Sequence, residues 1–263
     1  MRPAPLLAAE HLVKRFANGV RAVDDVSLDV GAGETVGIVG ESGSGKSTTA
    51  KLVLRLLDAD AGTLTFEGRD LRALRGAALR SVRRRLQLVP QNPQTSFNPR
   101  LRIGDSIAFN LTVHGTARRA ARARAAELLD QVGVATAHAR KYPHELSGGQ
   151  LQRCAIARAL ATEPALVICD EAVSSLDKSV QAQVLNLFAE LQRDTAIAFL
   201  FISHDLAVVE HVADRVVVMQ EGRVVEEASA ARLWEHPAHE YTRALLDATP
   251  ERQLARRAAL PAA

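Results

Sequence analysis

The residues with the clearest chemical potential lie between Gly40 and Ser47, where the chain reads G-E-S-G-S-G-K-S. This run fits the phosphate-binding pattern G-x-x-x-x-G-K-[ST] without a mismatch. The glycines let backbone N–H groups approach phosphate oxygens, and a following helix adds partial positive charge at its N-terminus. We therefore expect Lys46 to reach the β- and γ-phosphates of a nucleotide and the Ser47 hydroxyl to ligate Mg²⁺. The residues expected to contact the nucleotide here are Gly40, Glu41, Ser42, Gly43, Ser44, Gly45, Lys46, Ser47 and Thr48.

The flanking residues supply the structural context that this pattern needs. Residues 35–39 form a short apolar, β-branched run, and residues 48–57 carry apolar side chains at helical spacing. A strand, a glycine-rich loop and a helix are therefore predicted in sequence. The alternative is a glycine-rich turn that only connects a strand to a helix.

Other polar residues follow predicted strands in the same way. Gln91 comes after the apolar run 86–89, and Asp170 and Glu171 come after the run 165–169. His204 follows residues 196–202. Continuous apolar runs suit parallel strands that are buried on both faces, and ligands bind at the carboxyl edge of such sheets. We therefore expect these polar side chains to converge with the phosphate loop on one nucleotide.

The remaining segments predict a mixed α/β chain. Alternating residues predict short strands between residues 6 and 30 and at 62–66, which would form an antiparallel sheet. Residues 95–163 are expected to form an inserted helical subdomain. Further elements are predicted as helices at 117–132, 150–160 and 207–212, a strand pair at 216–219 and 224–226, and short helices from 229 onwards.

Composition excludes several classes of protein. The 263 residues are 47% hydrophobic and 24% charged, which is ordinary for a globular protein, and they contain no apolar run of about 18 residues that could span a bilayer. The N-terminus lacks the pattern of a signal peptide, so a cytoplasmic location is expected. Cys154 and Cys169 are predicted to be buried thiols. The arginine clusters at 80–85 and 118–124 favour solvated helix faces over nucleic-acid binding, because no aromatic residues are interleaved for base stacking.

A second glycine motif, L-S-G-G-Q, occupies residues 146–150 before a predicted helix. Its expected anion-binding residues are Ser147, Gly148, Gly149 and Gln150. Taken alone, the motif favours a serine cap with a glycine turn. Together with the phosphate loop, Gln91, residues 166–171, Ser175-Leu176-Asp177 and His204, it resembles the ATP-binding cassette (ABC) ATPases in motif order along most of the chain.

This resemblance implies a RecA-like P-loop core with an antiparallel β subdomain and the inserted helical subdomain. It places the ATPase domain at residues 1–230 and a C-terminal helical tail at 231–263. It also implies a head-to-tail dimer in which each ATP lies between the phosphate loop of one subunit and the signature at 147–150 of the other. Asp177 would lie at the subunit interface.

The resemblance also implies roles for single residues. Phe16 would stack on adenine, although a lone Phe can also belong to the core. Glu171 would polarise the attacking water, and His204 would contact the γ-phosphate, unless it is a helix-capping histidine. Asp170 would complete the Mg²⁺ shell with Ser47. Gln91 would contact Mg²⁺ or the water.

One position departs from the family pattern. Proline commonly follows the catalytic glutamate, and this chain has Ala172 instead. Because the chemistry requires only the glutamate, we do not infer an inactive site.

Three stretches are similar to the ATPases of bacterial dipeptide and oligopeptide importers, whose relatives carry nickel and glutathione. They are residues 90–103, 141–150 and 236–250. The similarity implies ATP and Mg²⁺ as cofactors, two membrane permeases and a second ABC ATPase as partners, and an extracytoplasmic solute-binding protein as an indirect one. The expected location is the cytoplasmic side of the inner membrane. No cysteine follows Cys169, so the iron–sulfur cluster of many relatives is not expected.

Two functions outside transport stay open at this point. One is a subunit of a soluble enzyme assembly of the carbon–phosphorus lyase type, and the other is a nucleic-acid-associated ABC ATPase. Repair members of the second class carry long insertions, and translation members carry two cassettes. The sequence has neither feature.

Overall fold

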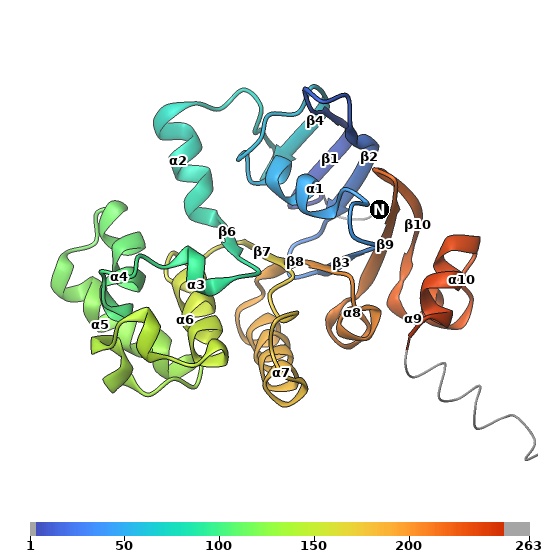
Figure 1. Ribbon diagram of the computed structural model, residues 1–263. Coiled ribbons are helices and arrows are strands. Elements are labelled where there is room, and N and C mark those ends of the chain that lie inside the picture. Colours follow the sequence, from blue (N-terminus) through green and yellow to red (C-terminus); the bar gives the residue numbers. More distant parts are fainter. Residues whose placement is uncertain (1–3, 250–263) are drawn as a thin grey trace, which may run out of the picture. The chain divides into compact units, whose positions relative to one another are not determined.

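The computed structural model describes residues 4–249, which fall into two compact units (Figure 1). Of the described residues, the first unit comprises 4–72 and 201–249, and the second comprises 73–200. The predicted tail residues 250–263, including the arginines at 256 and 257, lie outside the described part of the chain. The predicted domain boundary at residue 230 stays a prediction.

An antiparallel sheet opens the first unit, as the alternating sequence predicted. Its strand order is β2-β1-β4-β5. The strands are β1 (Leu7–Arg15), β2 (Arg21–Val30), β4 (Ala61–Phe66) and β5 (Arg69–Asp70). In β2, Val26, Leu28 and Val30 are buried while Ser27 between them is exposed. The period of two residues in hydrophobicity therefore separates a core face from a solvent face.

A second set of strands in the first unit contains the strand before the phosphate loop. Strand β3 (Thr35–Val39) pairs in parallel with β9 (Arg215–Gln220), which pairs antiparallel with β10 (Arg223–Ser229). Every residue of β3 is buried. The helices of this unit are α1 (Lys46–Val53), α8 (Leu206–Val212), α9 (Ala230–Glu235) and α10 (Glu240–Asp247). The predicted strand at residues 35–39 is thus confirmed, and the burial of all its residues shows that β3 is covered on both faces.

The C-terminal helices pack on the strands of the first unit through one apolar cluster. Leu233 of α9 and Leu246 of α10 are fully buried in it. The same cluster contains Val39, the last residue of β3. The segment after β10 is therefore held against the strand that leads into the phosphate loop.

The second unit combines parallel strands with most of the helices. Strands β6 (Leu86–Val89) and β7 (Leu166–Asp170) are parallel, with Val89 opposite Cys169. Strand β8 (Ala198–Ser203) carries the chain from this unit into the first. The α-helices are α2 (Gly76–Arg85), α3 (Pro93–Ser96), α4 (Ile103–Val113), α5 (Arg118–Gln131), α6 (Gly148–Leu160) and α7 (Lys178–Thr195), and the 3₁₀ helices are η1 (Thr136–Arg140) and η2 (Pro143–Glu145).

Several sequence predictions about this unit are confirmed. The predicted helices at 117–132 and 150–160 correspond to α5 and α6 within two residues at each end. Arg80 and Arg83–Arg85 on α2 are exposed, as expected for a solvated helix face. Cys154 and Cys169 are buried, and burial raises the pKa of Cys154 to about 12. Burial, with a smaller contribution from neighbouring Asp170, raises the pKa of Cys169 as well.

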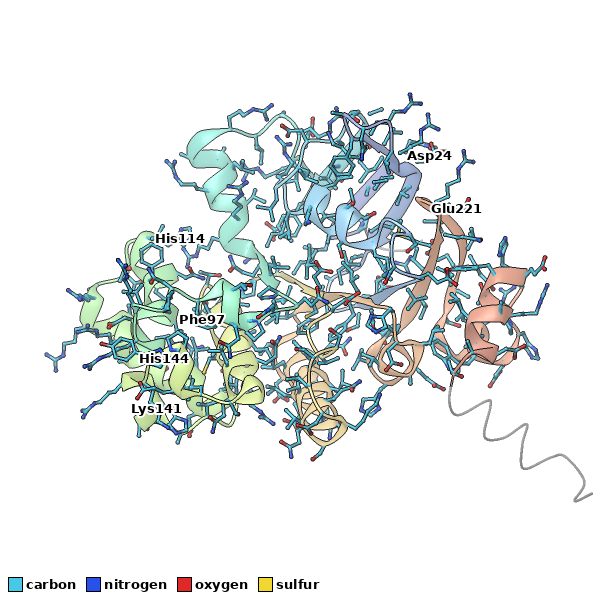
Figure 2. The ribbon with its side chains drawn as sticks, viewed as in Figure 1. Asp24, Phe97, His114, Lys141, His144 and Glu221 are labelled. Atoms are coloured by element: carbon cyan, nitrogen blue, oxygen red, sulfur yellow. The ribbon has the colours of Figure 1, made fainter. Side chains whose placement is uncertain are left out.

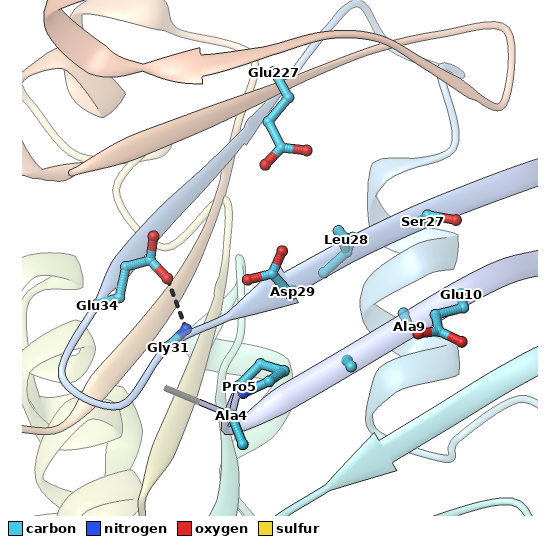
Figure 3. A pocket seen from close by; sticks show the side chains of 11 residues that line it. Ala4, Pro5, Ala9, Glu10, Ser27, Leu28, Asp29, Gly31, Glu34 and Glu227 are labelled. Atoms are coloured by element: carbon cyan, nitrogen blue, oxygen red, sulfur yellow. Dashed lines mark hydrogen bonds between the residues drawn. The ribbon is translucent and has the colours of Figure 1, made fainter. Parts of the chain in front are cut away.

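A buried arginine organises the carboxylates of the first unit. Arg215, at the start of β9, is 8% exposed and forms ion pairs with Asp29, Glu34 and Glu227. Burial would lower the pKa of Arg215, but hydrogen bonds and charge from these carboxylates outweigh it and raise the pKa. The three carboxylates, together with Glu10, line a cavity of about 740 Å³ (Figure 3).

We expect Arg215→Met to destabilise the protein by about 2–3 kcal/mol, because it leaves three neighbouring carboxylates without their cation. Arg119→Met is the matched control, since Arg119 lies exposed on α5 and its replacement should change stability by less than about 0.5 kcal/mol. Urea unfolding of both variants measures the difference. Equal midpoints for the two variants would show that the network contributes nothing to stability.

Candidate functional site

The phosphate loop has the strand–loop–helix context that its sequence predicted. Strand β3 ends at Val39, the loop follows, and α1 begins at Lys46. The helix begins two residues before the predicted start at 48 and ends at Val53 instead of 57. The N-cap of α1 is Gly45, which has no side chain to cap the helix, and the first turn contains no acidic residue. An uncapped, positively polarised helix end therefore faces the loop.

The Lys46 ammonium group lies inside this loop. Its Nζ atom donates hydrogen bonds to the carbonyl oxygens of Gly40 and Glu41, each at 2.7 Å, and lies 3.4 Å from Ser44 Oγ. Lys46 is only 4% exposed, and a buried charge needs such partners. These two partners are carbonyl oxygens, so a phosphate oxygen, which is a charged acceptor, can replace them with a stronger bond.

Gly45 is required by the packing of the loop. Its φ of 99° lies in the left-handed region, and a Cβ atom there would lie 2.3 Å from the carbonyl oxygen of Ala22 in β2. Any side chain would therefore clash with backbone of the antiparallel sheet. The glycine holds the loop close to β2, which a larger residue would prevent.

A residue of the C-terminal segment also contacts the loop, and sequence reasoning missed it. The backbone N–H of Glu41 donates a hydrogen bond of 3.0 Å to the hydroxyl of Tyr241 in α10. Tyr241 belongs to the stretch 236–250 that resembles the oligopeptide importers, but no feature of the sequence pairs it with the loop. The two residues are 200 positions apart.

Gln91 and Glu171 are brought together within the second unit. The Nε2 atom of Gln91 donates a 2.7 Å hydrogen bond to Oε2 of Glu171. Gln91 follows β6 and Glu171 follows β7, and these strands are parallel and in register at their ends. Parallel pairing therefore explains why residues 80 positions apart meet.

The backbone of Glu171 adopts an uncommon conformation. Its φ is 48°, in the left-handed region that non-glycine residues seldom occupy. Its carbonyl oxygen accepts hydrogen bonds from the backbone N–H and the hydroxyl of Ser174, at 3.1 and 3.0 Å. Ala172, at the position where the family commonly has proline, is 1% exposed. Such conformations cluster at functional sites, where the surrounding structure fixes them.

The signature residues form the N-terminus of α6. Ser147 is its N-cap: Ser147 Oγ accepts from the N–H of Gln150 at 3.3 Å, and Ser147 N–H donates to Oε1 of Gln150 at 3.2 Å. The serine-cap alternative is thus confirmed, and it is compatible with anion binding, because a hydroxyl that accepts one bond can still donate another. Gly148 and Gly149 lie in the first turn, and Gly149 lets α6 approach Val180 of α7.

The other predicted site residues occupy helix starts and turns. Asp177 caps α7 by accepting from the N–H of Val180 at 2.9 Å. Asp205 caps α8, so the helix-cap alternative for the exposed His204 is wrong. Phe16 is 39% exposed in the turn between β1 and β2, so the core alternative for Phe16 is wrong as well.

The structure describes the predicted site residues in two separate groups. Phe16, the loop 40–48 and His204 belong to the first unit, whereas Gln91, Asp170, Glu171 and the signature belong to the second. Asp170, the last residue of β7, lies beside Glu171 in the chain. The convergence of both groups on one nucleotide stays a prediction.

Comparison with known proteins places these motifs in a family. Residues 23–174 match the family described as ABC transporter. The glutathione import ATP-binding protein GsiA of Pectobacterium atrosepticum is 50% identical over 264 residues, covering 96% of this chain and 42% of the relative. The protein of the same name from Escherichia coli K12 is 48% identical over 257 residues, covering 94% and 41%. The chain thus spans about two fifths of the length of these curated relatives.

Solved structures share the fold. The structure of cbiO1 from Clostridium perfringens, described as part of the ABC transporter complex cbiONQ, has a TM-score of 0.82 at 24% identity, covering 97% of this chain and 100% of that one. The ATP-binding cassette MJ0796, solved as a dimer bound to ADP and Pi, has a TM-score of 0.78 at 27% identity, covering 85% and 98%. The predicted RecA-like α/β fold is therefore confirmed.

We expect Gly45→Ala to destabilise the protein more than Gly43→Ala. Both glycines have positive φ, so alanine costs about 1 kcal/mol of backbone strain at either position. Only at Gly45 does the added Cβ atom overlap backbone, which should cost about 2 kcal/mol more, whereas nothing lies within 4 Å of a Cβ atom at Gly43. Urea unfolding of the two variants checks the difference, and equal losses would contradict it.

Proposed function

Because the chain belongs to the ABC transporter family, we propose that it binds and hydrolyses ATP and thereby energises a membrane importer of peptides or related small solutes. The observation that carries this proposal is the phosphate loop, in which the uncapped N-terminus of α1 lies next to the buried Lys46. Both features favour a polyanion with several oxygen acceptors. ATP is such a ligand. Phe16, exposed in its turn, is available to stack on the adenine ring.

In this proposal, Glu171 accepts a proton from the attacking water. The amide of Gln91 orients its carboxylate through the 2.7 Å hydrogen bond, and the surrounding strand end fixes the backbone from which it projects. A carboxylate held in one orientation is a more effective general base than a mobile one. His204 would contact the γ-phosphate and add a further hydrogen-bond donor.

The chain has side-chain oxygens that could ligate Mg²⁺, the cation that accompanies ATP. Ser47 offers a hydroxyl and Asp170 a carboxylate, both of which suit a hard cation. Gln91 also suits a Mg²⁺ site. Its amide nitrogen donates to Glu171, so its amide oxygen is the atom that can face a cation. When bound, Mg²⁺ would neutralise charge on the phosphate oxygens.

The signature and the N-cap aspartate support a role in dimerisation. In the proposed head-to-tail dimer, Ser147 and the first turn of α6 would contact the ATP bound to the partner subunit, and Asp177 would lie at the interface. The similar cassette MJ0796 is dimeric in its solved structure. ATP would then hold two subunits together, and its hydrolysis would release them.

A permease-binding surface is proposed around Gln91 and residues 96–103. Leu101 within it and Phe109 beyond it are 39% and 58% exposed, and both line a cavity of about 420 Å³. Exposed apolar side chains around a cavity suit the insertion of a helix from a partner protein.

Helix α6 connects this surface to the signature. Arg158, near its end, donates to the carbonyl and hydroxyl oxygens of Ser96 at 2.7 and 3.0 Å. Its guanidinium carbon lies 4.2 Å from the ring centroid of Phe97, which is labelled in Figure 2. Because Ser147 begins the same helix, a shift at the signature would move Ser96 and Phe97 with it.

The proposed location is the cytoplasmic face of the membrane, where the chain would bind two permeases and a second ABC ATPase, with a solute-binding protein on the other side. Among residues 4–249, no helix has the length and apolar character needed to cross a bilayer. The relatives are named for glutathione import, which supports a peptide-type solute.

The test of this assignment is co-purification from gently solubilised native membranes with the chain tagged at its N-terminus. Recovery of two permeases and a second ATPase, together with a solute-binding protein, is the expected result. Recovery only with enzyme subunits or ribosomes from the soluble fraction would overturn the transport role and leave the ATPase chemistry standing.

We expect Glu171→Gln to keep ATP affinity, lower kcat by about a hundredfold or more, and form a persistent ATP-dependent dimer. Glutamine keeps the size of the side chain but cannot accept the proton. Glu163→Gln is the matched control, because Glu163 is exposed and has a similar φ of 52° at the other end of β7, and its hydrolysis should stay at the wild-type rate. Phosphate release and size-exclusion chromatography measure both variants. Wild-type turnover in Glu171→Gln would remove this residue from the mechanism.

A further inference from the structure

The hydrogen bond between Glu41 and Tyr241 joins the phosphate loop to the C-terminal helix α10. The donor is the backbone N–H of Glu41, the second residue of the loop, and the acceptor is the Tyr241 hydroxyl at 3.0 Å. Both residues belong to the first unit. None of the roles assigned above to the loop uses this contact.

The contact fixes the N–H end of the Gly40–Glu41 peptide group, whose carbonyl end interacts with Lys46. The carbonyl oxygen of Gly40 accepts from Lys46 Nζ at 2.7 Å. When Lys46 turns towards a phosphate, it must leave this carbonyl. The tyrosine hydroxyl then still holds the N–H side of Glu41, so the start of the loop keeps its position while its lysine moves.

Tyr241 is itself held by a well-anchored segment. The carboxylate of Glu226 in β10 accepts hydrogen bonds from the N–H groups of Ala238 and His239, at 2.8 and 2.9 Å. The N–H of Tyr241 donates to Nδ1 of His239 at 3.2 Å. Tyr241 and Trp234 also pack against the apolar cluster that contains Val39, the last residue before the loop. The hydroxyl is therefore presented from a rigid support, which limits the entropy cost of the contact.

The hydroxyl keeps its proton at physiological pH. Burial raises the pKa of Tyr241, with only partial opposition from the hydrogen bond to Glu41. A neutral hydroxyl can accept from Glu41 and places no negative charge near a loop that binds phosphates.

We propose that Tyr241 is a positioning residue of the phosphate loop, which holds the Glu41 peptide in the conformation that receives the nucleotide. The inference rests on the proposed function, because it concerns ATP affinity. It also assigns a role to the segment at 236–249: this segment supports the nucleotide site from outside the loop.

The test uses the purified full chain and the variant Tyr241→Phe, which keeps the ring in its cluster and removes only the hydroxyl. We expect the Kd for a fluorescent ATP analogue with Mg²⁺ to rise about fivefold, which corresponds to the loss of one neutral hydrogen bond. KM for ATP should rise by a similar factor with kcat nearly unchanged, because the contact acts on binding. Hydrogen exchange at the Glu41 amide should accelerate.

Thr249→Val is the matched control. It removes another hydroxyl of the same segment, which donates to the carbonyl of Leu246 at 2.7 Å and does not contact the loop. We expect its Kd and its Glu41 exchange rate to equal those of the wild type. The fluorescence of Trp234, the single tryptophan of the chain, should be unchanged in Tyr241→Phe if the segment stays in place.

Each result decides between the inference and the function on which it rests. Tight ATP binding by the wild type and by Tyr241→Phe alike would overturn the role of Tyr241 and leave the proposed function intact. A shifted Trp234 emission, together with an equal loss of affinity in Thr249→Val, would show that the affinity falls because the C-terminal segment has loosened. That result would also overturn the role of Tyr241. Failure of the wild type to bind ATP would overturn both proposals.

Discussion

The pairing of parallel strands is the constraint on which the chemistry of each unit depends. In the second unit, the register of β6 and β7 sets Val89 opposite Cys169, so the loops that follow leave from the same end. That geometry alone brings the Gln91 amide to the Glu171 carboxylate. In the first unit, β3 pairs with β9 in the same sense, and the phosphate loop leaves from the end of β3. The buried strands therefore fix the positions at which the polar loops begin.

The second constraint is that a buried cation needs polar partners, and the protein provides them in two ways. Lys46 donates hydrogen bonds to two carbonyl oxygens of its own loop, which carry only partial charge. Arg215 is surrounded by carboxylates, which are strong ones. Exchange of a carbonyl partner for a phosphate oxygen is a gain in electrostatic free energy, whereas exchange of a carboxylate partner is not. This difference in partners suits Lys46 to ligand binding and Arg215 to stabilising the fold.

Much of the fold was predictable because local patterns and tertiary burial agree. Residues 86–89 appear as β6 with the predicted bounds, and the apolar runs at 165–169 and 196–202 appear as β7 and β8 shifted by one or two residues. The longest helix, α7 at Lys178–Thr195, was not predicted, although Asp177 provides its cap and Val184, Leu187 and Leu191 provide its apolar face. The contact of Tyr241 with Glu41 could not be predicted, because a hydrogen bond across 200 residues depends on tertiary packing and leaves no local pattern. The left-handed backbone of Glu171 could not be predicted either, because glutamate, unlike glycine or asparagine, has no preference for that region.

The charge of the acidic cavity in the first unit affects where a nucleotide can bind. Four carboxylates line it, those of Glu10, Asp29, Glu34 and Glu227, and the neighbouring Arg215 is already engaged with three of them. A triphosphate that diffuses over this surface meets a repulsive potential there in spite of the space available, whereas the helix end at Gly45 attracts it. By shape alone this cavity could hold a polyanion, and its carboxylates disfavour that binding. The carboxylates around Arg215 would therefore disfavour phosphate binding in this cavity, in addition to their predicted contribution to stability.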